Sequence, residues 1–126
     1  MNKKNSMKNA IKAILEYEFY REYGNKYGEK ISFSDMIMIV DKLYKNHMLS
    51  YRMQMLYIAY NNGYYELKRY YNRNKDKLAN YTKRIENEND NDVYFYYSNK
   101  WMKVFEQNLM ISTIMRAVKT IKIIKK

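Results

Sequence analysis

Apolar residues recur at three- and four-residue spacing along most of the chain, which is the pattern of helices with one buried face. Residues 3–23 show it first, with apolar positions at Met7, Ile11, Ile14, Leu15, Phe19 and Tyr23. Gly24 follows, and glycine tolerates the backbone conformations in which helices end. We therefore expect a first helix over residues 3–23 and a loop over residues 24–30.

A serine precedes each of the next two apolar patterns. Its short side-chain oxygen can accept the free backbone N–H groups of a helix's first turn. Ser32 or Ser34 is thus predicted to cap a helix over residues 35–46, and Ser50 a helix over residues 51–61. The inward positions are expected to be Ile37, Val40, Leu43 and Tyr44 in one helix and Met53, Leu56, Tyr57 and Tyr60 in the other.

A basic, tyrosine-rich stretch occupies residues 64–84, directly after the helix-stop sequence of residues 61–63 (NNG). Its pattern predicts a helix from residue 64 to about residue 79. A helix, a glycine turn and a basic helix follow one another in the order of a helix-turn-helix, whose second helix lies on DNA. Ala59 and Gly63 also have the spacing of the small residue and the turn glycine in that motif.

Residues 81–97 differ from the helical pattern before them. Residues 81–86 alternate loosely, residues 87–92 are NENDND, and residues 93–97 are VYFYY, which has strong strand propensity. We interpret this stretch as a small β-hairpin, the wing of a winged helix-turn-helix. In the competing interpretation the basic helix continues, a polar loop follows, and another helix begins.

A long final helix is predicted over residues 99–124, with Ser98 as its cap. About 25 helical residues span roughly 37 Å, which is longer than a domain of this size needs. We therefore expect this helix to pair with its copy in a homodimer, as an antiparallel or crossed pair because no heptad is sustained. The residues predicted to make the dimer contact are Trp101, Phe105, Ile111, Ile114 and Val118.

Together these elements predict a mainly α-helical fold: a helix-turn-helix, winged by a hairpin near residues 81–97, with a long C-terminal helix. A chain of 126 residues suits one core. We expect a single domain of residues 1–126, made of an N-terminal helix (1–23), a helix-turn-helix and wing (31–97), and the final helix (98–126).

The distribution of charge points to a polyanion as partner. The formal net charge is +11, from 24 Lys and Arg against 13 Asp and Glu. Residues 64–84 hold 7 basic and 2 acidic residues, whereas residues 85–97 hold 4 acidic residues and no basic one. Such a field attracts nucleic acid first and an anionic membrane second. An AT-rich genome would also explain part of the lysine and tyrosine content.

Nucleic-acid-binding residues are predicted on the basic helix. Lys and Arg neutralise phosphates and release counterions, while Arg and Asn can hydrogen-bond base edges in the major groove. The predicted set is Tyr65, Lys68, Arg69, Asn72, Arg73, Lys75 and Lys77. The alternative is a helix face that its lysines merely keep solvated. Two features fit the motif poorly: Tyr70 and Tyr71 stand where aliphatic residues are usual, and the predicted wing tip is acidic.

No catalytic site is expected. His47 is the only histidine and there is no cysteine, so a zinc site is excluded, and the acidic run lacks the glycine and final glutamate of a calcium loop. Phosphate-loop and nucleophile motifs do not occur either. We expect no enzyme activity, no cofactor and no metal. The longest apolar runs, residues 36–40 and 93–97, predict no stable membrane insertion, and without a signal peptide a cytoplasmic, intracellular protein is the default.

The first functional hypothesis is a homodimeric, sequence-specific or semi-specific DNA-binding protein, with RNA as the second nucleic acid considered. It would be a regulator, partition or replication-accessory factor from a phage, plasmid or other AT-rich genome. The alternative is a small protein-binding inhibitor of the phage anti-defence or anti-CRISPR type, or a basic ribonucleoprotein component; a protein partner could use the acidic loop of residues 86–92. The remaining hypotheses are a peripheral membrane protein using residues 116–126 and single-strand binding by exposed tyrosines.

Overall fold

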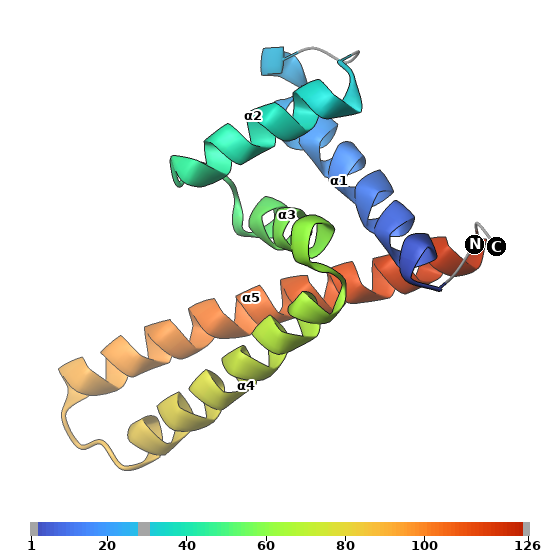
Figure 1. Cartoon of the computed structure of the whole chain (residues 1–126). Coiled ribbons are helices and arrows are strands. Elements are labelled where there is room, and N and C mark those ends of the chain that lie inside the picture. The colour runs from blue at the N-terminus through green and yellow to red at the C-terminus, as the bar shows by residue number, and fades with distance from the viewer. Residues whose placement is uncertain (1–2, 28–30, 125–126) are drawn as a thin grey trace.

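The computed structural model describes residues 3–27 and 31–124, and within these ranges the chain is mainly helical, as predicted, and has no strand. The five helices are α1 (Lys3–Tyr27), α2 (Phe33–Lys45), α3 (Tyr51–Asn62), α4 (Tyr65–Glu86) and α5 (Asn91–Ile124). α1, α2, α3 and the C-terminal half of α5 form a helical body (Figure 1). Residues 75–107, from α4 and α5, project from that body as an antiparallel helical hairpin, which we call the arm.

The caps predicted at Ser32 and Ser50 are confirmed, whereas Ser34, also considered for α2, and Ser98, predicted for α5, lie inside those helices and are not caps. The Ser32 hydroxyl oxygen accepts a hydrogen bond from the backbone N–H of Asp35 at 3.1 Å, and α2 begins directly after it. The Ser50 hydroxyl does the same for the backbone N–H of Met53 at 3.3 Å, where α3 begins. In each case the serine oxygen satisfies one of the N–H groups that have no partner in the first turn.

The first helix continues beyond Gly24, so the prediction that it ends there is wrong. α1 runs to Tyr27, while residues 28–30 of the predicted loop lie outside the described part of the chain. Aromatic packing explains the extension: the Phe19 ring lies 5.6 Å from that of Tyr23 and 6.0 Å from that of Tyr27, measured between centroids. Side chains at four-residue spacing share one helix face, so this packing holds Gly24 in helical conformation.

The turn between α3 and α4 depends on Gly63. Its backbone has φ 106° and ψ 160°, a combination that only glycine adopts without strain. Its N–H donates to the carbonyl of Ala59 at 2.8 Å, which closes the last turn of α3. One residue, Tyr64, then separates the glycine from α4, so the two helices are joined by a very short connection.

The predicted β-hairpin at residues 81–97 is wrong. α4 continues to Glu86, residues 87–90 form a loop, and α5 begins at Asn91, eight residues earlier than predicted. Asp90 starts α5 by accepting hydrogen bonds from the backbone N–H groups of Asp92 (2.8 Å) and Val93 (3.3 Å). The strand propensity of VYFYY is overridden because Tyr97 packs on Tyr81 across the two helices, with 6.0 Å between ring centroids.

The core lies where α1, α3, the start of α4 and the C-terminal half of α5 meet. Its largest fully buried side chains include Ile11, Leu15, Phe19, Met53, Leu56, Leu67, Ile111 and Ile114. One carboxylate is buried with them: Glu18 of α1 pairs with Arg21 at 2.8 Å and lies 3.9 Å from Arg52 of α3. α2 adds Met36, Val40 and Leu43 to this core, whereas Tyr44, predicted to be inward, is 39% exposed.

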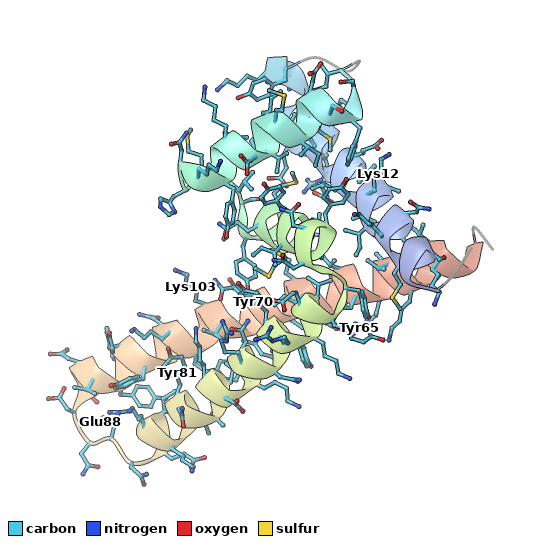
Figure 2. All side chains as sticks on the ribbon, in the orientation of Figure 1. Lys12, Tyr65, Tyr70, Tyr81, Glu88 and Lys103 are labelled. Atoms are coloured by element: carbon cyan, nitrogen blue, oxygen red, sulfur yellow. The ribbon has the colours of Figure 1, made fainter. Side chains whose placement is uncertain are left out.

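The arm has little buried surface of its own. Beyond Asn74 no residue of α4 is fully buried, and on the α5 side of the arm only Val104 is. The contact between the helices is made by half-buried residues, namely Leu78, Tyr81, Ile85, Val93, Tyr97 and Trp101. Figure 2 shows Tyr81 between the two helices and Glu88 at the tip of the arm.

Candidate nucleic-acid interface

All seven basic residues of α4 are exposed to solvent. The reason is the placement of its apolar positions: Leu67, Leu78 and Ile85 lie on the side that faces the body and α5. In a helix of 3.6 residues per turn, the seven basic positions fall away from that side and face solvent. The exposed basic residues are Lys68, Arg69, Arg73, Lys75, Lys77, Lys83 and Arg84.

The predicted binding residues of α4 form one broad surface, which we call the basic face: Lys68, Arg69, Asn72, Arg73, Lys75 and Lys77. At 3.6 residues per turn, Arg73 and Lys77 fall on one flank of this face, and Arg84 continues the same row towards the tip. Lys68 and Lys75 fall on the other flank, roughly 140° or more around the helix axis from Arg73. Arg69 and Asn72 lie between the flanks, together with the exposed Asp76.

Only one of these basic residues is neutralised within the described part of the chain. The Arg69 guanidinium pairs with Glu66 at 2.7 Å, an exposed contact three residues back along the helix. An exposed pair of this kind contributes less than about 1 kcal/mol, so a stronger anion can displace it. Glu66 therefore leaves most of the positive charge of the basic face available to a ligand.

Tyrosine rings hold several of the cations in place without neutralising them. The Arg73 guanidinium lies 5.2 Å from the ring centroid of Tyr70, and the Lys75 ammonium lies 5.9 Å from that of Tyr71. Both tyrosines are half-buried at the edge of the core. A cation over an aromatic ring keeps its full charge, so these contacts leave both side chains able to meet an anion.

Tyr65, the remaining predicted binding residue, lies at the body end of α4 and is 66% exposed. Its ring packs edge-on against that of Tyr64, with 5.9 Å between centroids. Beside it is a groove of about 670 Å³ between the start of α1 and the α3–α4 turn, lined also by Lys8 and Tyr60. Tyr65 thus lies next to the basic face and on neither of its two flanks.

A second group of cations and tyrosines lies further along the arm, around Tyr96 and Tyr97, where sequence reasoning named no binding residue. Lys100 lies over the ring of Tyr96 at 4.6 Å, and the hydrogen bond from Lys100 to the Tyr96 hydroxyl raises the pKa of the ammonium. Arg84 lies over the ring of Tyr97 at 5.2 Å. The four-residue spacing of Tyr96 and Lys100 was a signal for this contact, but it was hidden by the β-hairpin interpretation.

The acidic run of residues 86–92 is at the tip of the arm, beyond the basic face. Asp90 is used as the cap of α5, and Glu88 accepts a hydrogen bond from the backbone N–H of Asp90 at 2.9 Å. Negative charge at this place is stabilised by the N-terminal end of the α5 dipole. A protein partner for this loop stays a prediction.

The residues predicted to form a dimer contact lie in two different environments. Ile111, Ile114 and Val118 are at most 1% exposed, because α5 presents them to the chain's own core. Trp101 and Phe105 lie on the arm, where their rings stack 5.0 Å apart and the Trp101 Nε1–H donates to the Thr82 hydroxyl at 3.2 Å. Phe105 remains 40% exposed, so a second copy can reach it while the three core residues are covered.

No group of three or more His, Cys, Asp or Glu side chains within residues 3–27 and 31–124 is arranged to hold a metal ion. His47 is exposed in the α2–α3 connection, with φ 57°. None of the helices in this described part combines the length and the apolar character needed to cross a bilayer.

Comparison with known proteins gives no relative from which a function could be transferred. No protein-family model matches the chain, no curated protein is similar to it, and no solved structure matches its fold. The functional argument therefore depends on the geometry of the helices and their charges.

Proposed function

We propose that the chain binds duplex DNA through the basic face of α4, as a helix-turn-helix in which α3 and the Gly63 turn support the second helix. One observation carries this proposal. All seven cations of α4 are exposed, and Arg69 alone among them pairs with a carboxylate of the described chain. Folding has thus gathered unneutralised positive charge on one helix. When these cations meet DNA phosphates, the counterions bound to the DNA are released, and this release would supply most of the affinity.

The placement of the residues suits a major groove. The groove is about 12 Å wide and admits one α-helix, whose two flanks then lie near the two phosphate backbones. On α4 the flanks carry Arg73 and Lys77 on one side and Lys68 and Lys75 on the other. The middle of the face carries Arg69 and Asn72, side chains that can hydrogen-bond guanine and adenine edges respectively. A DNA-binding protein without a catalytic site would act as a regulator, or as a partition or replication-accessory factor.

The proposal is tested with a variant in which Lys68, Arg73 and Lys77 are changed to Gln. We expect this variant to bind a mixed-sequence 30-base-pair duplex about 500-fold more weakly at 100 mM salt, because each lost phosphate contact lowers the affinity roughly eightfold there. The matched control changes Lys26, Lys42 and Lys103 to Gln, which removes the same charge from exposed lysines outside α4. Lys103 projects from the arm on the side away from α4 (Figure 2).

The control should keep its affinity for the duplex within about threefold. At 100 mM salt, charges that do not touch the DNA are largely screened, so their loss weakens binding far less than the loss of direct phosphate contacts. Equal losses in both variants would show that net charge, and not the basic face, binds DNA. Tighter binding of single-stranded DNA or RNA than of the duplex in the same assay would overturn the assignment to duplex DNA. Circular dichroism of each variant establishes that the helices are retained.

A further inference from the structure

Residues 94–109 of α5 carry an apolar strip that no part of the described chain covers. Its members are large and about half exposed: Tyr94 (41%), Phe95 (61%), Met102 (57%), Phe105 (40%) and Leu109 (53%). Side chains of this size are usually buried, and a row of them on one helix marks a surface that is made for contact with protein.

The strip is straight and continuous. Phe95, Met102 and Leu109 follow one another at seven-residue intervals, and a step of seven residues returns to the same helix face within about 20°. From Phe95 to Leu109 the strip is roughly 21 Å long, at 1.5 Å per residue. Phe105 fills the space between Met102 and Leu109, and its stacking on Trp101 keeps it in a fixed position.

The area of the strip corresponds to the apolar part of a stable protein interface. If a large side chain has roughly 200 Å² of surface, the five members expose about 500 Å² together. A standard interface buries about 800 Å² per partner, of which about three-fifths is apolar. Polar residues within and beside the strip, such as Ser98, Asn99 and Glu106, would supply the rest.

The charges at the two ends of the strip are opposite in sign. Towards the tip of the arm lie Glu88, Asp90 and Asp92, and no ion pair of theirs with Lys or Arg occurs within the described residues. Seven residues beyond Leu109, on the same helix face, lies Arg116. Its guanidinium donates to the Ser112 hydroxyl at 3.3 Å and has no carboxylate partner in the described chain.

We infer that the occupant of this strip is a second copy of the chain, whose α5 lies antiparallel with the two Met102 side chains meeting at the two-fold axis. In this register Phe95 of each copy lies opposite Leu109 of the other. Arg116 is roughly 21 Å from the axis, and the partner's Asp92 is roughly 15 Å from it on the same side, so one helical turn separates them and an arginine side chain spans that distance.

Charge decides between the antiparallel and the parallel arrangement. In a parallel pair the acidic tips would lie side by side, and each Arg116 would face its own copy, so both ends would repel. In the antiparallel pair each acidic tip faces Arg116 of the other subunit. The acidic tip, which fits DNA poorly, thus has a role in dimer contact. No member of the strip belongs to the basic face. The tests of dimerisation and of DNA binding therefore give independent results.

Sedimentation of the full chain tests the existence of the dimer. We expect the wild-type chain to sediment as a dimer at micromolar concentration and Met102→Glu to raise the dissociation constant at least 100-fold, because two like charges would meet at the axis without a partner. Met38→Glu on α2, where the methionine is 69% exposed, is the matched control and should leave the dimer intact. A wild-type chain that stays monomeric at 100 μM, or equal effects of the two substitutions, would overturn the proposal.

Disulfide trapping tests the antiparallel register, since the chain has no cysteine and each introduced thiol acts alone. With diamide as oxidant, Met102→Cys should cross-link to its own copy. Phe95→Cys alone should not, because its two copies would be roughly 21 Å apart, but mixed with Leu109→Cys it should cross-link efficiently. Self-linking of Phe95→Cys would show a parallel pair and reject the proposed register, whatever the outcome of DNA binding.

Discussion

Asn74 of α4 and Asn108 of α5 are hydrogen-bonded to each other in the interior, with 3.0 Å between Asn74 Nδ2 and Asn108 Oδ1. Both side chains are about 95% buried at the place where the arm leaves the body. Asn108 also donates to the backbone carbonyl of Tyr71 at 3.1 Å, and Asn74 donates to the Tyr51 hydroxyl at 3.4 Å. A buried polar pair is satisfied in one register only, so it sets how α4 and α5 align.

Replacement of one asparagine should cost more than replacement of both. Asn108→Ala removes one hydrogen bond from the buried Asn74 amide, which keeps only its longer bond to Tyr51, and one from the Tyr71 carbonyl. This loss should lower the free energy of unfolding by about 2–3 kcal/mol. The double change of Asn74 and Asn108 to Leu removes both polar groups and should be much less destabilising than Asn108→Ala. Urea denaturation followed by the fluorescence of Trp101 measures both. A double variant as unstable as the single one would contradict the role of the pair.

The asparagine pair shows the limit of what a sequence pattern predicts. Leu67, Asn74 and Tyr81 follow one another at seven-residue intervals, which places Asn74 on the apolar face of its helix. That it meets Asn108, 34 residues further on, depends on the length of the loop at the tip and on where α4 ends. Neither was correct in the β-hairpin interpretation, because residues 93–97 have the local propensity of a strand and only their packing on α4 makes them helical.

The serine caps of α2 and α3 could be predicted from sequence, whereas the Ser98 cap and the end of α1 at Gly24 were wrong. Ser32 and Ser50 cap their helices because a cap needs only three or four adjacent residues. The wide apolar stripe of α5, in contrast, could not be divided from sequence into core and exposed parts. Ile111 and Ile114 proved to face the chain's own core, while Met102 and Leu109, which have similar hydrophobicity, are exposed to solvent.

The two described glycines should respond in opposite directions to substitution by alanine. Gly63→Ala forces a side chain into φ 106°, which should destabilise the protein by about 1–3 kcal/mol even though an added Cβ would touch nothing. Gly24→Ala, inside α1 and also free of steric contact, should stabilise it by about 0.5–1 kcal/mol. Thermal unfolding of the two variants decides this. An unchanged melting temperature for Gly63→Ala would mean that the turn has another conformation.

The Tyr57–Asp41 hydrogen bond should make stability depend on pH in the acidic range. The Tyr57 hydroxyl donates to the Asp41 carboxylate, and this bond, with a smaller effect from Lys45 at 2.9 Å, lowers the pKa of Asp41. Because the folded state then binds the proton less readily than the unfolded state, the stabilisation is present above about pH 4 and is lost as the pH falls through the lowered pKa.

Tyr57→Phe should therefore raise the pKa of Asp41 towards its ordinary value, as measured by NMR titration of the carboxyl carbon. The difference in melting temperature between the wild type and this variant should be largest near neutral pH and should shrink at acidic pH. Tyr44→Phe is the control, because the Tyr44 ring packs 5.3 Å from that of Tyr57 but is not the donor to Asp41. Equal shifts of the Asp41 pKa in both variants would show that packing, and not the hydroxyl, is responsible.

The salt dependence of DNA binding should report how many phosphates the basic residues of α4 contact. If Lys68, Arg73, Lys75 and Lys77 each meet a phosphate, together with Arg84 in the same row, log K should fall with log salt at a slope of about −4.5. Changing Lys68, Arg73 and Lys77 to Gln should reduce that slope to about −2. Asn72→Ala should leave the slope unchanged and weaken binding only to duplexes whose bases it contacts, because an amide releases no counterion. A slope that stays the same after loss of the three cations would place the DNA on another surface of the molecule.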